Sequence, residues 1–167
     1  MTAVLLAARY GHADVMKCLL DNGALHEDAG SGTSALCWAA EYGYPDVVEV
    51  LVNHEVNLDF QESTGRTALS WAAEWGQLEV LELLVKHGAD ASLQSEDARS
   101  PLHWAAEYGH TKCIKALLKS GVDASEPGKE GMTALHWAAE YGHEECLEIL
   151  LDHDAKVDEA GTDGKTA

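Results

Sequence analysis

Four glutamates recur in the sequence between two aromatic residues, and such a grouping of side chains could bind a cation. Each acid lies three residues after a tryptophan and one residue before a second aromatic residue. On a helix, positions i, i+3 and i+4 lie on one face, so the three side chains of each triplet would be neighbours. A carboxylate pairs with Lys or Arg, and aromatic rings attract cations through their faces. The triplets are Trp38–Glu41–Tyr42, Trp71–Glu74–Trp75, Trp104–Glu107–Tyr108 and Trp137–Glu140–Tyr141; Tyr10 belongs to an earlier copy in which Arg9 replaces the acid.

These triplets recur because the whole sequence repeats with a nearly constant period. The phrase LHWAAEYGH occurs at residues 102–110 and again at 135–143, and close variants occur at 35–44 and 68–77. A small hydroxyl residue precedes each copy at intervals of 32 and then 33 residues, namely Thr2, Ser34, Thr67, Ser100, Thr133 and Thr166. A fixed period of this length indicates supersecondary units that stack on one another.

Each unit predicts two helices joined by a short turn. The hydroxyl residue suits the N-cap of the first helix, and Pro101 suits the position after a cap. A glycine would end each first helix, at Gly11, Gly43, Gly76, Gly109 and Gly142. The second helix, for example residues 78–87, would end at Gly23, Gly88 or Gly121 in three units. Glu55 and Asp154 hold that position in the other two units, at a cost of about 1 kcal/mol if the backbone there is left-handed.

The period of 33 residues, the motif T-P/A-L-H-x-A-A, the Gly-His pair and the Leu-Leu before Gly-Ala-Asp resemble the ankyrin repeat. The resemblance covers essentially the whole chain. It implies an all-α solenoid of stacked antiparallel helix pairs with a turn or β-hairpin finger at each junction, and no enzyme chemistry intrinsic to the fold. We expect one array over residues 1–167, with repeats at 1–28 (incomplete at its start), 29–61, 62–94, 95–127 and 128–160, and a truncated sixth repeat beginning at 161–167.

The first residues do not look like the polar cap that ends a solenoid, because Val4, Leu5 and Leu6 open the first unit. We therefore interpret the sequence as a segment of a longer array. A truncated but complete protein is the alternative.

The net charge of −18, from 29 acidic and 11 basic residues, argues against a nucleic-acid partner and permits a cationic one. The longest apolar run covers residues 3–8, far short of the roughly 20 residues of a membrane helix. Residues 1–11 lack the pattern of a secretory signal. Four cysteines without paired spacing indicate a reducing compartment. We expect a monomer in the cytoplasm, with the nucleus as the alternative, and no membrane contact.

The repeated histidines and cysteines have a structural explanation that requires no metal. In the ankyrin pattern, the equivalents of His103, His110, His136 and His143 bond the cap hydroxyl and nearby backbone. Cys113 and Cys146 each lie three residues after a histidine, a spacing that zinc could use, but they hold the position of Val47 and Val80. We therefore predict buried cysteines and no metal site, cofactor or disulfide.

Two explanations of the triplets stay open. In the first, tryptophan fills a gap between helices, the second aromatic residue shields it, and duplication copied the solvated glutamate. In the second, the triplets form a ladder that binds a partner. The glutamates favour the second explanation, because an acid in the last turn of a helix is disfavoured by about 0.3–1 kcal/mol. The ankyrin resemblance also implies that these positions line a concave groove.

We therefore expect a non-enzymatic protein-interaction module whose acidic, aromatic groove binds a Lys/Arg-rich segment of another protein through Tyr10 and the four triplets. A structural spacer within a larger scaffold is one alternative. No phosphate-binding glycine loop and no nucleophile beside a base is evident, so an enzyme is not expected.

A second alternative comes from a partial resemblance to the ankyrin repeats of the euchromatic histone-lysine methyltransferases, which bind methylated lysine in a cage. Four cage positions match here at Trp38, Glu41, Trp71 and Trp75, and they match again one and two repeats later. The fifth position, a further tryptophan in that family, is held by Thr33, Arg66 or Arg99. A guanidinium there would repel a methylated ammonium, which counts against the second and third cages.

Overall fold

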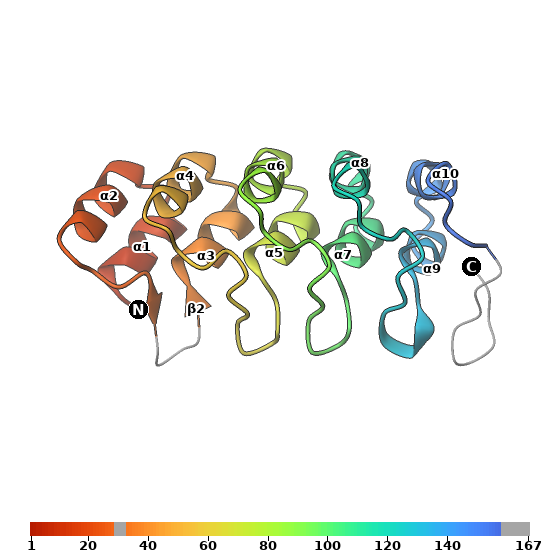
Figure 1. The fold of residues 1–167 in the computed structure, drawn as a ribbon, viewed down its shortest axis with the longest axis horizontal. Coiled ribbons are helices and arrows are strands. Elements are labelled where there is room, and N and C mark those ends of the chain that lie inside the picture. Colours follow the sequence, from red (N-terminus) through yellow and green to blue (C-terminus); the bar gives the residue numbers. More distant parts are fainter. Residues whose placement is uncertain (29–32, 158–167) are drawn as a thin grey trace.

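The chain forms two rows of α-helices in a computed structural model, which describes residues 1–28 and 33–157 (Figure 1). The first helix of each pair is α1 (Ala3–Arg9), α3 (Ala35–Tyr42), α5 (Ala68–Glu74), α7 (Pro101–Glu107) or α9 (Ala134–Glu140). The second is α2 (Ala13–Asp21), α4 (Pro45–Asn53), α6 (Leu78–Lys86), α8 (Thr111–Lys119) or α10 (Glu144–Leu151). The described residues also include the two-residue strands β1 (Glu27–Asp28) and β2 (Thr33–Ser34) and the 3₁₀ helix η1 (Lys129–Gly131). The predicted all-α array of helix pairs is confirmed.

Hydroxyl residues cap the first helices, as predicted. The side chains of Thr2, Ser34 and Thr67 accept hydrogen bonds from the backbone N–H three residues later, at 3.2, 3.1 and 3.3 Å. Each bond satisfies an N–H that has no partner within its own helix. The sixth predicted cap, Thr166, lies outside the described residues.

Histidines complete the caps of α7 and α9. Nδ1 of His103 accepts from the backbone N–H of Ser100 at 3.1 Å and lies 2.8 Å from its hydroxyl, and His136 has the same contacts with Thr133 at 3.1 and 2.9 Å. Burial lowers the pKa of His103 to about 4, because a charged imidazole would lose its hydration there. The ring is therefore a neutral acceptor at neutral pH.

A second set of histidines links neighbouring pairs. Nε2 of His110 lies 2.8 Å from the backbone carbonyl oxygen of Glu74, one repeat earlier, and His143 makes the equivalent contact with Glu107 at 2.8 Å. The ring of His110 reaches this position because Gly76 has no side chain. A Cβ at Gly76, where φ is 66°, would lie 2.6 Å from Nδ1 of His110. These contacts agree with the linking role that the ankyrin resemblance implies.

The second helices end in a left-handed backbone whether or not a glycine is available. Glu55 and Asp154 have φ values of 56° and 64° at the position that Gly23 and Gly88 hold in other pairs. The predicted cost of about 1 kcal/mol at each of these two ends therefore applies.

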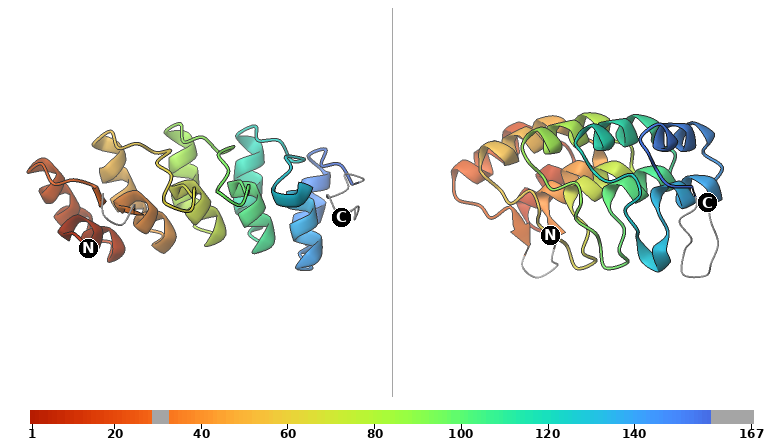
Figure 2. Two further views of the ribbon diagram at one scale, coloured as in Figure 1. Left: turned by 90° about the horizontal axis from the view of Figure 1, so that it is seen from below. Right: turned by 45° about the vertical axis from the view of Figure 1, so that its right-hand side comes forward.

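Small apolar side chains allow the pairs to stack side by side, as Figure 2 shows. First helices pack on first helices and second helices on second helices. The paired alanines of α3, α5 and α7 are fully buried at these contacts. Cys113 and Cys146 are also buried, as free thiols, and burial raises the pKa of each to about 11. The prediction that these cysteines serve as small apolar residues is confirmed.

The loops between pairs project as fingers below the row of first helices (Figure 1). Two of the fingers close with a backbone hydrogen bond across five residues, from Glu62 N–H to the Arg66 carbonyl at 2.9 Å and from Ser95 N–H to the Arg99 carbonyl at 3.0 Å. Adjacent fingers are joined as well, by Glu96 N–H to the Thr64 carbonyl at 2.9 Å. Arg66 and Arg99, each one residue before a helix cap, are thereby held beside α5 and α7.

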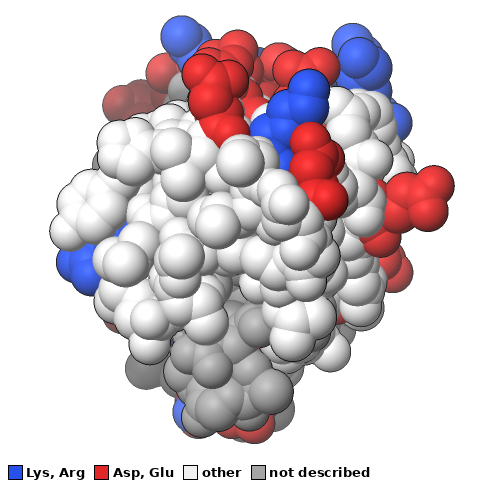
Figure 3. All heavy atoms as spheres, turned by 90° about the vertical axis from the view of Figure 1, so that its left-hand side faces the viewer, with Lys and Arg blue, Asp and Glu red and all other residues white. Residues whose placement is uncertain are grey.

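The N-terminal end of the array presents a surface with few charges (Figure 3). Leu6, Val15 and Leu25, which belong to the first pair and the loop after it, are 42%, 51% and 78% exposed. Within the part of the chain that the structure describes, no helix has the length and apolar character needed to cross a membrane. The expected sixth repeat start at 161–167 lies outside that part, and the repeat boundaries stay a prediction.

Candidate functional site

The ladder, by which we mean Tyr10 and the four aromatic–glutamate triplets, divides into two rows that differ in exposure. The tryptophans of the first row are half-buried, except Trp104, which is only 9% exposed. The second row is open to solvent, with exposed fractions between 40% and 59%, and consists of Tyr10, Tyr42, Trp75, Tyr108 and Tyr141. The side chains of the second row can therefore contact a partner directly. The tryptophans of the first row are less accessible and lie on either side of the spaces between repeats.

Arginine side chains lie between successive tryptophans of the first row. The guanidinium carbon of Arg66 is 3.6 Å from the ring centroid of Trp71 and 4.1 Å from that of Trp104. Arg99 lies in the same way 4.7 Å from Trp104 and 3.9 Å from Trp137. Trp104 thus has two guanidinium groups against it, Arg66 from the preceding repeat and Arg99 from its own, and it is the most buried of the four.

The glutamates of these two repeats bind the same arginines. A guanidinium nitrogen of Arg99 lies 2.5 Å from a carboxylate oxygen of Glu107, and Arg66 pairs with Glu74. All four side chains are between 11% and 17% exposed, so these are largely buried ion pairs. Arg66 is held by two indole faces and one carboxylate, and Arg99 by two indole faces and two carboxylates, because Asp97 lies 3.2 Å from its Nε as well. We call these arrangements the Trp71–Trp104 site and the Trp104–Trp137 site.

Tyrosines of the second row reach the same carboxylates. Burial and the carboxylate of Glu74 raise the pKa of Tyr108, and the carboxylate of Glu107 raises that of Tyr141. Each of these phenols lies beside the acid of the preceding repeat. Burial also raises the pKa of Glu107, against the opposing effect of Arg99. In the two arginine-containing sites, a glutamate therefore has both a guanidinium and a phenol as neighbours.

The Trp38–Trp71 site has the same walls and no arginine of its own. Its residues are Trp38, Glu41, Trp71 and Trp75, and Thr33 stands in the sequence where Arg66 and Arg99 stand in the next two repeats. Among the described residues, the carboxylate of Glu41 has no hydrogen-bond or ion-pair partner. Trp75, which replaces the tyrosine, has no hydroxyl to offer it.

A second carboxylate lies next to this site. Nε1 of Trp71 donates a hydrogen bond to Glu62 at 2.8 Å. Burial, reinforced by the carboxylates of Glu74 and Glu62, raises the pKa of Glu41. The only arginine against Trp38 is Arg9, 5.1 Å from its ring centroid, and it comes from the first repeat, on the side away from Trp71. The Trp38–Trp71 site is thus acidic, aromatic and without a cation between its indoles.

These contacts change the interpretation of the glutamates. All four were predicted to cost stability, but Arg66 and Arg99 neutralise the charges of Glu74 and Glu107 within the chain. Glu140 ends α9 and is exposed, and Glu41 is half-buried and unpaired. In the second and third methyl-lysine cages that the sequence suggested, the guanidinium lies between the two indoles where the ligand would lie.

Arg66 and Arg99 were predicted only as departures from a cage pattern, and their contacts with the indoles and the glutamates were not predicted. A usable signal was present. The sequence has three arginines, and two of them lie five residues before a ladder tryptophan and one residue before a helix cap.

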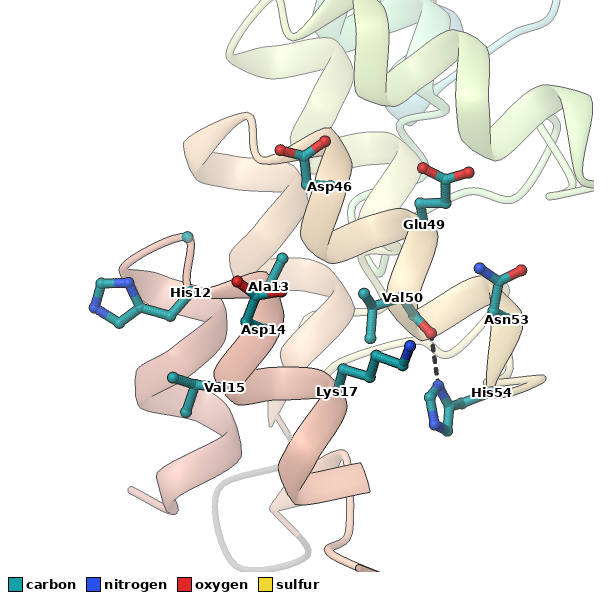
Figure 4. Close-up of a pocket in the computed structure, with 11 residues that line it drawn as sticks. His12, Ala13, Asp14, Val15, Lys17, Asp46, Glu49, Val50, Asn53 and His54 are labelled. Carbon is teal, nitrogen blue, oxygen red and sulfur yellow. Dashed lines mark hydrogen bonds between the residues drawn. The ribbon is translucent and has the colours of Figure 1, made fainter. Parts of the chain in front are cut away.

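A separate hollow lies on the row of second helices, between α2 and α4 (Figure 4). Its volume is about 670 Å³, and its lining mixes Lys17 and His54 with Asp14, Asp46 and Glu49. The ring of His54 is held by the Val50 carbonyl at 2.8 Å and by Asp21 at 2.9 Å, and both raise its pKa. Its carboxylates outnumber its cations, and it shares no residue with the ladder. No set of three His, Cys, Asp or Glu side chains within residues 1–28 and 33–157 is arranged to hold a metal ion.

A family model described as ankyrin repeats (3 copies) matches the chain twice, over residues 4–95 and 87–160. A comparison with curated proteins gives no match.

Proposed function

Because the chain belongs to the ankyrin repeat family, whose repeats generally act as protein–protein interaction modules rather than enzymes, we propose that it binds a basic segment of another protein along the ladder. The observation that carries this proposal is the second row of the ladder, five exposed aromatic side chains from Tyr10 to Tyr141, one in each helix pair. Exposed aromatic residues that recur at the same position of successive repeats are typical of binding surfaces.

The negative net charge of the chain supports the proposal that the partner is basic. With a net charge of −18, the protein attracts basic segments over long range and repels acidic ones. Near the aromatic row, Glu41 and Glu140 have no ion pair among the described residues. They are available to Lys or Arg from a partner. The ladder also binds guanidinium groups of its own chain, so its chemistry suits the proposed ligand.

The proposal is tested by titrating a labelled Arg/Lys-rich peptide at low and high salt, with a Glu-rich peptide of equal length as the control. We expect binding of the basic peptide alone, weakening as salt rises because exposed charges are screened. Trp75→Ala and Tyr108→Ala should each weaken binding about tenfold, since each removes an exposed ring that can cover a cation.

Leu151→Ala is the matched control, because Leu151 is a similarly exposed apolar residue (44%) on α10, in the row of second helices. Binding that is absent at low salt, or that falls equally in the Leu151 variant, would contradict the proposal. Absence of binding would favour the structural spacer.

A further inference from the structure

We infer that the Trp38–Trp71 site is a receptor for one arginine side chain of the partner, whose guanidinium inserts between the two indoles and pairs with Glu41. The inference rests on the proposed function, because it names the side chain that the basic segment inserts and the place that receives it.

The first support is that the next two repeats hold a guanidinium with the same residue types. The Trp71–Trp104 site binds Arg66 through two indoles and Glu74, and the Trp104–Trp137 site binds Arg99 through two indoles and Glu107. Trp38, Trp71 and Glu41 hold the equivalent positions one repeat earlier, at the same spacing. Because α3 packs on α5 as α5 packs on α7, the walls of the three sites are formed in the same way.

The second support is the charge that the Trp38–Trp71 site lacks. Thr33 stands in place of the arginine, so Glu41 has no ion-pair partner among the described residues, and Glu62 adds a second carboxylate beside Trp71. In the next repeat, Ser95 stands in the place of Glu62, and its hydroxyl is bonded to Asp97 and to the Arg99 carbonyl. The Trp38–Trp71 site therefore has one cation fewer than the Trp71–Trp104 site, while an acid, Glu62 or Asp97, lies in the finger in both repeats.

The third support concerns why the ligand is arginine rather than lysine. A guanidinium is planar, stacks on aromatic faces and is less strongly hydrated than an ammonium, so it fits between two indoles with its edge toward a carboxylate. The chain itself follows this preference. All three of its arginines lie against ladder aromatics, and every cation–π contact of the described residues is made by one of them.

The site is accessible to a side chain from outside. Trp38, Trp71 and Glu41 are each half-buried, and Trp75, 53% exposed, belongs to the same cluster. An inserted arginine would give Glu41 the ion pair that Glu74 and Glu107 already make with arginines of the chain.

The test compares three peptides that are identical except for one central residue, which is arginine, lysine or trimethyl-lysine. We expect the arginine peptide to bind about tenfold more tightly than the other two, because stacking on two indoles and pairing with a carboxylate act together. Thr33→Arg should abolish this preference by supplying an internal guanidinium, whereas Thr33→Ala should keep it. Glu41→Gln, a variant of equal size, should reduce it.

Equal affinity for the three peptides, tighter binding of trimethyl-lysine, or an unchanged arginine preference in Thr33→Arg would overturn the inference while leaving the proposed function intact. If none of the peptides binds, the proposed function fails. The site is then judged with ethylguanidinium alone. Saturable shifts of the Trp38 and Trp71 indole N–H signals in NMR would uphold the site, and no shift would overturn it.

Discussion

The Trp38–Trp71 site and the Trp71–Trp104 site are one repeat apart and are built from nearly the same residues, yet they differ in where the positive charge comes from. In the Trp71–Trp104 site, Arg66 of the chain lies between the indoles and pairs with Glu74. In the Trp38–Trp71 site, Thr33 replaces that arginine, and the carboxylate of Glu41 has no ion-pair partner within the part of the chain that the structure describes. The difference between threonine at position 33 and arginine at position 66 therefore distinguishes a candidate binding site from a structural contact.

The comparison also shows that a repeated residue need not have a repeated role. Glu41 and Glu74 occupy the same position in consecutive repeats. Glu74 stabilises the stack because its charge is matched within a largely buried pair. Glu41 has no such ion pair, so its negative charge near the C-terminal end of a helix still lowers the stability of the fold. A residue whose cost is compensated in two repeats and not in a third is a candidate for function in the third.

The largest expected effect comes from removing an internal arginine. Arg66→Ala should lower the free energy of unfolding by about 3 kcal/mol, because it leaves Glu74 largely buried without a counter-charge and removes a guanidinium from between two indoles. Arg9→Ala is the matched control and should cost less than about 1 kcal/mol, since Arg9 lies further from its rings and makes no ion pair among the described residues. Urea denaturation followed by circular dichroism measures both. Equal costs would remove the distinction between the sites.

A smaller effect of opposite sign is expected from giving the Trp38–Trp71 site its own arginine. Thr33→Arg should raise the free energy of unfolding by about 1 kcal/mol, because the new cation–π and ion-pair contacts outweigh the ordering of the side chain. The melting temperature should rise accordingly, and Thr33→Ala should leave it nearly unchanged. A destabilised Thr33→Arg variant would mean that the site does not accept a guanidinium.

The smallest effect concerns pH. Because the pKa of Glu41 is raised in the folded protein, protonation favours folding, and the ionised form costs stability once the pH exceeds the folded pKa. Glu41→Gln should therefore stabilise the protein at pH 7, by less than about 1 kcal/mol because Glu41 is partly screened by solvent. The gain should vanish below the ordinary glutamate pKa of 4.5.

Glu74→Gln is the matched comparison for this test, and it should destabilise the protein at pH 7 because it leaves Arg66 without its carboxylate. Thermal melts of both variants at pH 7 and at pH 4 measure whether each substitution raises or lowers the stability of the protein. The same sign for both variants at pH 7 would show that the two glutamates are equivalent.

Sequence alone predicted the repeat, the caps and the helix ends, since these depend on local rules. A hydroxyl at an N-cap, proline after it and glycine with a positive φ act within a few residues, and each is found where the pattern indicates. The sequence could not predict the pairing of Arg66 with Glu74, because Arg66 lies outside the repeated phrase and its direction is set by the closure of a finger. The solvent exposure of the tryptophans could not be predicted from the sequence either. Trp71 and Trp104 hold the same repeat position, but Trp104 is more buried and has arginines of two repeats against its ring.

The most direct test of the account is a crystal structure of the protein bound to a basic peptide that contains a single arginine. The account predicts that the peptide lies along the second row of the ladder, with its guanidinium between Trp38 and Trp71 and paired with Glu41, while Arg66 and Arg99 keep their positions. A peptide bound away from the ladder, or an arginine that points to solvent beside an unchanged Glu41, would contradict it.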